Sequence, residues 1–234
     1  MGMKTDFIKS KESEVSSQTT NETTDLLIKL SFKPVFKEIH NENSFNELES
    51  NRLSELFKAS KVFNYKSMQT KTLTEIINLK QINIVCNTML DKDVLDLIQF
   101  TKSLTSFKNM CFNDQMALFK YGCLEILILR CSISYDTNTE YWKWVWLSAI
   151  ILFNPDRPNI LHRDVVKAEQ QLYIYLLQRY LYLRYRSEVE THMKLAKLMD
   201  PLKDLQIICD IEKENCLDGI GPILKEILYD ITAN

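Results

Sequence analysis

Glycine and proline are scarce in this sequence, with 4 glycines and 5 prolines among 234 residues. Tight β-hairpins depend on these residues at their turns, so the scarcity disfavours a fold built from short strands. Leu, Ile, Lys and Glu are abundant instead, a balance that is typical of long helices. Hydrophobic residues make up 45% of the chain, which is enough for one substantial core. We therefore predict an all-α protein with one main domain.

An excess of basic charge is also missing. The formal net charge is −2, so the chain lacks the positive field that would hold nucleic-acid phosphates, and direct DNA binding is disfavoured. The six cysteines contain no C-x-x-C pair and the three histidines are far apart in sequence, so the spacing of a zinc site is absent. We expect no metal and no cofactor, and we interpret the cysteines as buried thiols in a reducing compartment.

Long apolar runs are the third absence. The longest run, residues 145–153, is too short to span a bilayer, and residues 1–25 lack the apolar centre of a signal peptide. Residues 1–43 are rich in Ser, Thr, Lys, Glu and Asn and are predicted to be a flexible leader. We expect an intracellular protein with no membrane partner.

Helical periodicity begins after this leader. Apolar spacing predicts helices over residues 44–63, 73–104, 118–133, 164–188 and 192–212. Asn113 and Asp114 are predicted to cap the third of these. Pro155 and Pro158 predict a loop, and the alternating tryptophans of residues 142–146 predict a short strand or an apolar plug.

Arg130 interrupts a helix that is apolar almost all round. A buried guanidinium costs several kcal/mol unless it is paired, so a partner inside the protein is required. Two hypotheses stay open. Arg130 forms a structural ion pair with Glu125, Asp136 or Asp93, or it contacts a polar group of a bound ligand.

The end of the chain predicts a conditional helix over residues 222–230. Pro222 suits the first turn of a helix, and Ile223, Leu224, Ile227 and Leu228 share one face. Helices shorter than about 12–15 residues are marginal in water, so this one is expected to form only against the body of the domain. Such a helix can act as a switch.

Four ordered stretches resemble the ligand-binding domain of nuclear receptors. They are the signature region FTKSLTSFKNMCFNDQMALFKYGCLEILILR, the interhelical loop AIILFNPDRP, the ninth-helix segment LQRYLYLRY and the terminal activation helix PILKEIL. The resemblance implies an all-α, three-layer antiparallel helical sandwich over residues 44–234. Within the family it is similar to the branch that holds vitamin D, ecdysone and nematode dafachronic acid receptors, with the nematode dauer-control steroid receptor as the nearest likeness.

The resemblance also implies a function. Family members are nuclear transcription factors, found in some cases in the cytoplasm, that bind a lipophilic ligand and recruit coactivators carrying a Leu-x-x-Leu-Leu helix. A steroid-like ligand is implied, with a bile-acid-like steroid acid as the first candidate. The implied protein partner is a retinoid X receptor-like heterodimer partner or a second copy of the chain. Contact with DNA would come only through a separate domain that this sequence does not contain.

The site residues implied by the resemblance form two groups. In the coactivator groove, Lys102 and Lys120 bind one end of the coactivator helix and Glu226 binds the other, with Ile223 and Leu224 on the terminal helix. The ligand pocket is lined by two sets of helix positions: Met89, Leu90, Asp93 and Leu97, and Leu127, Arg130, Cys131 and Ser134.

The sequence departs from the family pattern between the fifth and eighth helices. Where the family has several tens of residues that wall the pocket, this chain has a short stretch around residues 136–147, and Pro201 interrupts the helix expected at the dimer interface. An alternative function is therefore a truncated receptor form that dimerises or sequesters partners without binding ligand. An enzyme is disfavoured, because no nucleophile with a nearby base, phosphate loop or paired carboxylates stands out.

Overall fold

The computed structural model describes residues 44–63, 79–134, 142–215 and 222–232, and within these ranges it leaves the side chains of 79–89, 131–134, 142, 212–215 and 228–232 undescribed. Every regular element in the described part is helical, as the composition predicted. The elements are α2 (Glu47–Ala59), η1 (Ser60–Phe63), α3 (Leu79–Ser103), α4 (Thr105–Asn109), α5 (Phe112–Ser134), α6 (Trp142–Leu152), α7 (Arg163–Tyr185), α8 (Glu188–Met199), α9 (Pro201–Asn215) and α10 (Pro222–Thr232).

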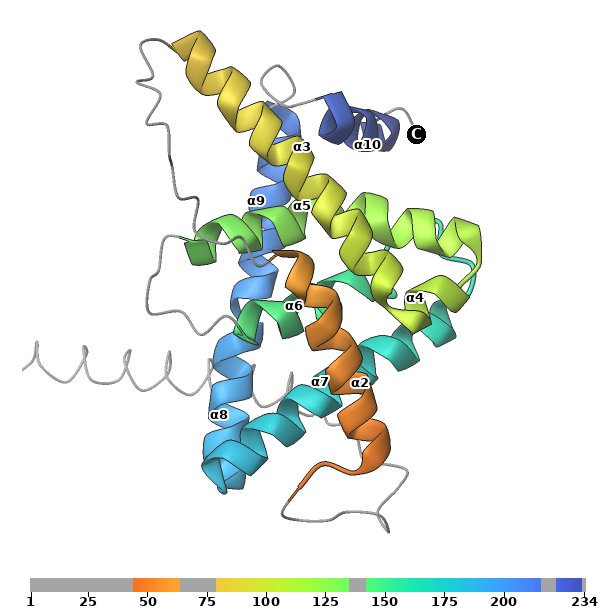
Figure 1. Ribbon diagram of the computed structural model, residues 1–234, viewed down its shortest axis with the longest axis vertical. Coiled ribbons are helices and arrows are strands. Elements are labelled where there is room, and N and C mark those ends of the chain that lie inside the picture. The colour runs from red at the N-terminus through yellow and green to blue at the C-terminus, as the bar shows by residue number, and fades with distance from the viewer. Residues whose placement is uncertain (1–43, 64–78, 135–141, 216–221, 233–234) are drawn as a thin grey trace, which may run out of the picture.

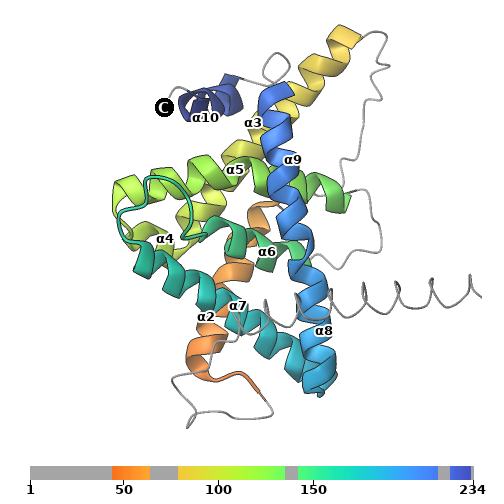
Figure 2. The ribbon, with the colours of Figure 1, turned by 180° about the vertical axis from the view of Figure 1, so that it is seen from behind.

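The helices are arranged in three layers, seen from opposite sides in Figures 1 and 2. Helices α2 and α3 form one face, α7, α8 and α9 form the other, and α5 and α6 lie between them. The middle pair makes the connecting contacts, since α5 packs against α3, α6 and α9, and α6 packs against α7. This arrangement explains why α5 and α6 carry apolar residues on nearly all sides: both are covered on two sides.

The outer layers are joined by a buried polar cluster. Asn46 and Glu49 form a capping box at the start of α2, with both hydrogen bonds at 2.8 Å. The other carboxylate oxygen of Glu49 accepts a 2.7 Å hydrogen bond from the Tyr175 hydroxyl of α7, and the Arg179 guanidinium lies 3.9 Å away. Burial and the Glu49 carboxylate raise the pKa of the Tyr175 hydroxyl, so the phenol stays protonated as a donor. The cluster fixes the start of α2 on α7.

The tryptophan-rich segment is helical, so the predicted short strand is wrong. Trp144 and Trp146 are buried in α6, with their rings against Phe63 and Phe57 at centroid distances of 4.9 and 6.1 Å. Apolar burial on nearly all sides overrides the two-residue alternation of the tryptophans. The alternative prediction of an apolar plug is confirmed, in helical form.

The cap predicted before the buried helix is also wrong. Helix α5 begins at Phe112, so Asn113 and Asp114 lie in its first turn. The carboxylate of Asp114 turns away to the chain that precedes α7, where it accepts hydrogen bonds from the backbone N–H groups of Leu161 at 2.6 Å and His162 at 3.2 Å. A long-range contact therefore replaces the local cap.

Pro201 divides the predicted helix over residues 192–212 into two. Helix α8 ends at Met199 and Pro201 is the first residue of α9, where its missing N–H costs no helical hydrogen bond. The two helices follow one another in a similar direction (Figures 1 and 2), so the proline interrupts the backbone ladder without turning the chain away.

Candidate functional site

Helix α10 packs against both α3 and α5. Leu224 is 1% exposed, while Ile223 and Ile227 are partly buried against the core and Glu226 points to solvent. Figures 1 and 2 place α10 beside the part of α3 that is remote from α4. The apolar face predicted for the terminal helix is therefore covered by α3 and α5, as its sequence requires.

The two predicted lysines lie on the helices that α10 contacts. Lys102 is exposed in the last turn of α3, seven residues after Leu95, which is 53% exposed, so both lie on one stripe of the helix. On α5, Lys120 is half-buried and lies four residues after Met116, which is 49% exposed. We call Leu95, Lys102, Met116 and Lys120 the α3–α5 surface. It combines exposed apolar side chains with positive charge on the two helices that α10, which carries Glu226, contacts.

The residues predicted to line the ligand pocket fall into three groups: some are buried in the core, two form an ion pair, and the side chains of the others are not described. Leu97 and Leu127 are fully buried in the core, and Leu90 is half-buried on α3. Met89, Cys131 and Ser134 are on described helices, but their side chains lie outside the described part. Asp93 and Arg130 join α3 to α5.

Arg130 has the carboxylate partner that one of the two hypotheses required. Its Nη1 lies 3.3 Å from Oδ1 of Asp93, and its guanidinium lies 4.3 Å from the ring centroid of Phe63 and 5.9 Å from that of Trp144. The structural ion pair with Asp93 is thereby confirmed. The pairing with Glu125 is wrong, because that carboxylate is bound elsewhere, and Asp136 lies outside the described residues.

Glu125 pairs with Arg157, an interaction that the sequence analysis missed. Both guanidinium Nη atoms donate to the carboxylate, at 2.5 and 2.6 Å, and the two side chains are 7% and 8% exposed. The pair ties the loop between α6 and α7 to the middle of α5. The sequence did contain a signal for this pair: Glu125 is a charged residue in an apolar helix, and Arg157 is a charged residue of opposite sign in the loop between Pro155 and Pro158.

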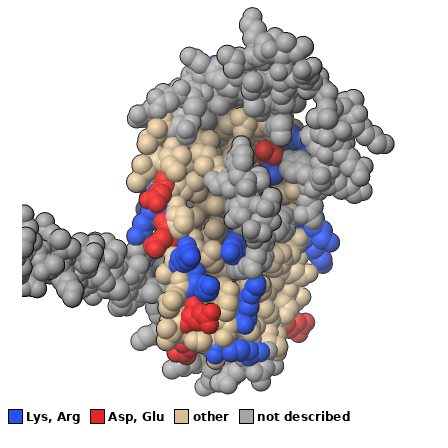
Figure 3. Space-filling model, turned by 90° about the vertical axis from the view of Figure 1, so that its left-hand side faces the viewer, with Lys and Arg blue, Asp and Glu red and all other residues tan. Residues whose placement is uncertain are grey.

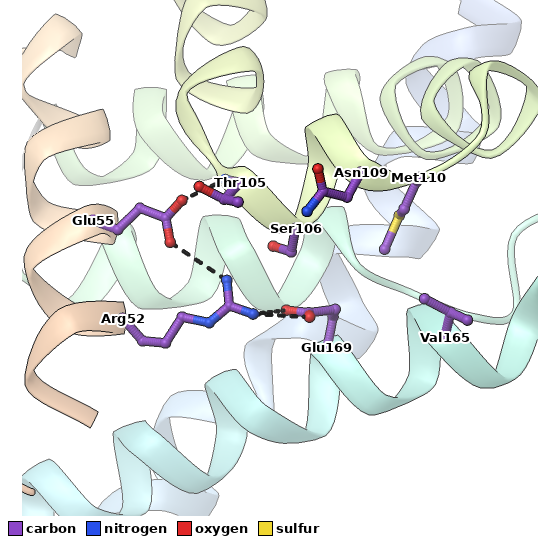
Figure 4. Close-up of a pocket in the computed structure, with 8 residues that line it drawn as sticks. All are labelled: Arg52, Glu55, Thr105, Ser106, Asn109, Met110, Val165 and Glu169. Carbon is purple, nitrogen blue, oxygen red and sulfur yellow. Dashed lines mark hydrogen bonds and ion pairs between the residues drawn. The ribbon is translucent and has the colours of Figure 1, made fainter. Parts of the chain in front are cut away.

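A polar hollow of about 360 Å³ lies between α2, α4 and α7, away from the predicted pocket. Figure 4 shows the Arg52 guanidinium reaching between two carboxylates, with distances of 3.4 Å to Glu55 and 3.1 Å to Glu169. Burial alone would raise the pKa of Glu55, but hydrogen bonds from Thr105 and the charge of Arg52 outweigh it, so the pKa is lowered. These charges satisfy one another, which indicates a structural network.

Two helices of the outer layer expose apolar side chains. On α9, Leu205 and Cys209 face the core, whereas Ile207, Ile208 and Ile211 are 60%, 45% and 51% exposed. On α8, Val189 and Met193 are 70% and 66% exposed, one turn apart. We call the five exposed side chains the α8–α9 stripe. Exposed apolar side chains that gather on one part of a surface are typical of interaction sites.

Surface charge is mixed on the side of the molecule drawn in Figure 3. Among the described residues there, Lys and Arg atoms are interspersed with Asp and Glu atoms, in keeping with the small net charge of the sequence. A mixed surface does not concentrate phosphate groups. Separately, the helices of the described part include none with the length and apolar character needed to cross a membrane.

Comparison with known proteins links these features to a family. Residues 69–141, which include the whole of α3, α4 and α5, match the family described as the ligand-binding domain of nuclear hormone receptor. The chain is 28% identical to Nuclear hormone receptor HR96 of Drosophila melanogaster over 179 residues, and 23% identical to Nuclear receptor subfamily 1 group I member 3 of Mus musculus over 179 residues. It is 25% identical to member 2 of the same mouse group over 159 residues.

These matches take in between 51% and 57% of this chain, and 25%, 50% and 36% of the three relatives. The chain thus spans half or less of the length of the relatives it matches. The matches support the resemblance to a nuclear receptor ligand-binding domain, and the all-helical layered fold agrees with it. Receptors of this kind are transcription factors and not enzymes.

Proposed function

We propose that this chain is a ligand-regulated transcription-factor module. It binds a small lipophilic, steroid-like molecule, docks α10 on α3 and α5, and then recruits a coactivator helix with a Leu-x-x-Leu-Leu pattern. The observation that carries this proposal is the docked α10, with Leu224 buried and Glu226 exposed beside helices that carry exposed leucine, methionine and lysine side chains. The module acts in the nucleus.

The α3–α5 surface has the chemistry that a short amphipathic helix requires. Leu95 and Met116 offer apolar contact for the leucines of the partner. The last carbonyl groups of a helix are unpaired and carry partial negative charge, so Lys102 and Lys120 bind that end. Glu226 accepts hydrogen bonds from the N–H groups at the other end. Because Glu226 belongs to α10, the second charge is in place only when α10 is docked.

Ligand binding favours the docked state by packing beside α3 and α5 under α10. A ligand that prefers one of two states by a few kcal/mol changes their populations by more than tenfold. The Asp93–Arg130 pair makes the choice of ligand specific. A steroid acid would have to compete with Asp93 for Arg130, whereas a neutral sterol could leave the 3.3 Å pair intact.

The test is a titration of a fluorescent Leu-x-x-Leu-Leu peptide, with and without candidate sterols and bile-acid-like acids. We expect ligand to tighten peptide binding by about tenfold or more, and the gain to disappear in Glu226→Ala and Lys102→Ala. Glu47→Ala and Lys167→Ala are matched controls, because both are exposed charges on α2 and α7. Equal losses in the control variants, or peptide binding that no ligand changes, would overturn the proposal.

A second candidate is a truncated receptor that pairs with partners without binding ligand. Two observations favour it. First, only residues 135–141 separate α5 from α6. Second, the alignment with the mouse group I member 3 is 179 residues long but covers only 57% of this 234-residue chain. The relative therefore has extra residues within the matched part. A pocket that lacks a wall would be open, and its affinity for an apolar ligand would be low.

In the second candidate, the α8–α9 stripe would pair with a retinoid X receptor-like partner or with another copy of the chain. Sedimentation of the protein alone and mixed with such a ligand-binding domain separates the two functions when it is combined with the peptide titration. Pairing that is lost in Ile207→Glu and Ile211→Glu, with no ligand effect on the peptide, supports the truncated form.

A further inference from the structure

We propose that Cys111, Asp114 and His162 form a binding site for a divalent transition metal of the zinc class. The three residues lie where the link between α4 and α5 meets the start of α7. Their ligand atoms, Sγ, a carboxylate oxygen and a ring nitrogen, all lie within 4.8 Å of one another. Thiolate, carboxylate and imidazole are the three side-chain groups that zinc prefers.

The distances fit a tetrahedral ion. Sγ of Cys111 is 3.6 Å from Nδ1 of His162. Zinc bonds of about 2.3 Å to sulfur and about 2.0–2.1 Å to nitrogen place such a pair about 3.5 Å apart. Nδ1 is 2.8 Å from Oδ2 of Asp114, so these two atoms would separate by about half an ångström to admit the ion. His162 has the freedom to move, because its side chain is 58% exposed.

The carboxylate is already oriented for the role. Oδ1 of Asp114 accepts a 2.6 Å hydrogen bond from the backbone N–H of Leu161, and the side chain is 1% exposed. Metal-binding carboxylates need such fixed outer contacts to hold their angle. Oδ2 faces the imidazole at 2.8 Å and also accepts the longer, 3.2 Å hydrogen bond from the backbone N–H of His162, so it is the oxygen available to an ion.

The arrangement does not suit a catalytic relay. In a thiol–imidazole–carboxylate relay the two ring nitrogens have separate partners, one for the nucleophile and one for the carboxylate. Here Nδ1 faces both Sγ and Oδ2, at 3.6 and 2.8 Å. A single cation that replaces the shared protons satisfies all three groups at once.

The site is accessible and incomplete as a protein cage. Among the described residues three ligands come together, and because Cys111 is half-buried and His162 exposed, we expect a fourth position open to water or an outside ligand. A bound ion would tie the first turn of α5 to the first residues of α7. Its effect on the fold is therefore local to this corner, which is distinct from the α3–α5 surface and α10.

The experiment is a titration of the reduced, chelator-treated full chain with Co²⁺, followed by competition with Zn²⁺. We expect a sulfur-to-cobalt charge-transfer band with tetrahedral d–d bands, one ion per chain, and displacement by Zn²⁺. Cys111→Ser should remove the sulfur band, and His162→Ala should weaken binding by about tenfold or more. His192→Ala is the matched control, because His192 is also exposed but lies outside the proposed site. This variant should bind Co²⁺ as the parent chain does.

Each variant is first checked for parental helical content by circular dichroism, and His162→Gln provides a second, milder change. A sulfur band that persists in Cys111→Ser would place the metal on another cysteine and overturn the proposal. Equal weakening in His192→Ala and His162→Ala, or binding of octahedral character without sulfur, would also overturn it.

Discussion

Two buried arginines show how differently two ion pairs of α5 are built. Arg157 binds Glu125 through two hydrogen bonds of 2.5 and 2.6 Å, with the side chains 7% and 8% exposed. Nη1 of Arg130 lies 3.3 Å from Oδ1 of Asp93, the two side chains are 12% and 23% exposed, and the guanidinium also lies over two aromatic rings. The first pair is closed and fixed in geometry, whereas the second is looser and lies at the end where α3, α5 and α10 meet.

The difference teaches where the molecule is rigid and where it can respond. A bidentate, buried ion pair holds one geometry, because moving either side chain would leave two charges unpaired in a medium of low dielectric. A longer ion pair that is partly exposed can exchange one carboxylate for another at smaller cost. A third network, formed by Arg52 with Glu55 and Glu169, is more exposed again, at 18–29%, and completes the series.

Breaking the closed pair should have the largest effect. Arg157→Met leaves the Glu125 carboxylate buried without its partner, and we expect the free energy of unfolding to fall by about 3–5 kcal/mol. Urea denaturation followed by circular dichroism measures this. The double variant Arg157→Met with Glu125→Leu should recover much of the loss, because no charge remains buried. A loss below about 1 kcal/mol in the single variant would remove the distinction between the two arginines.

Changing the looser pair should cost less and alter ligand choice. Asp93→Asn keeps a hydrogen-bond acceptor for Arg130, so we expect a loss of unfolding free energy of about 1 kcal/mol. The same change removes the competing carboxylate, so the affinity for a steroid acid should rise relative to that for a neutral sterol. Calorimetric titration with both ligand types measures the ratio. An unchanged ratio would show that Arg130 does not meet the ligand.

The exposed network should give the smallest effect, visible through pH. The pKa of Glu55 is lowered on folding from its ordinary value of 4.5, so its contribution is present above that pH and is lost as pH falls through the lower, folded value. We expect Glu55→Gln to lower the unfolding free energy at pH 7 by less than about 1 kcal/mol, and to flatten its dependence on pH below about 4.5, where the parent loses the same contribution. A steeper dependence in the variant would contradict the assignment.

Much of the fold follows from periodicity, because apolar faces must find cover. The helices near residues 44–63, 164–188 and 222–230 were predicted with small errors at their ends. The errors lie where distant parts of the chain meet. Asp114 looked like a local cap but binds the chain before α7, and residues 142–146 alternate like a strand but are enclosed on both sides as a helix.

The candidate site divides in the same way. The terminal helix and its apolar face were predicted from Pro222 onward, and its dock on α3 and α5 agrees with that prediction. The roles of Lys102 and Glu226 and of the ligand residues remain predictions. The thiol, carboxylate and imidazole of the metal proposal were passed over because Cys111 and His162 are 51 residues apart and no spacing rule joins them.

By itself, the sequence determined that this chain is helical, that its terminal amphipath needs a partner surface, and that buried arginines need carboxylates. These properties depend on local periodicity and on the cost of burying charge, which each residue carries wherever it lies. Only the tertiary structure decided that Glu125 belongs to Arg157 and Asp93 to Arg130, since the partner of a buried charge is fixed by which helices pack together.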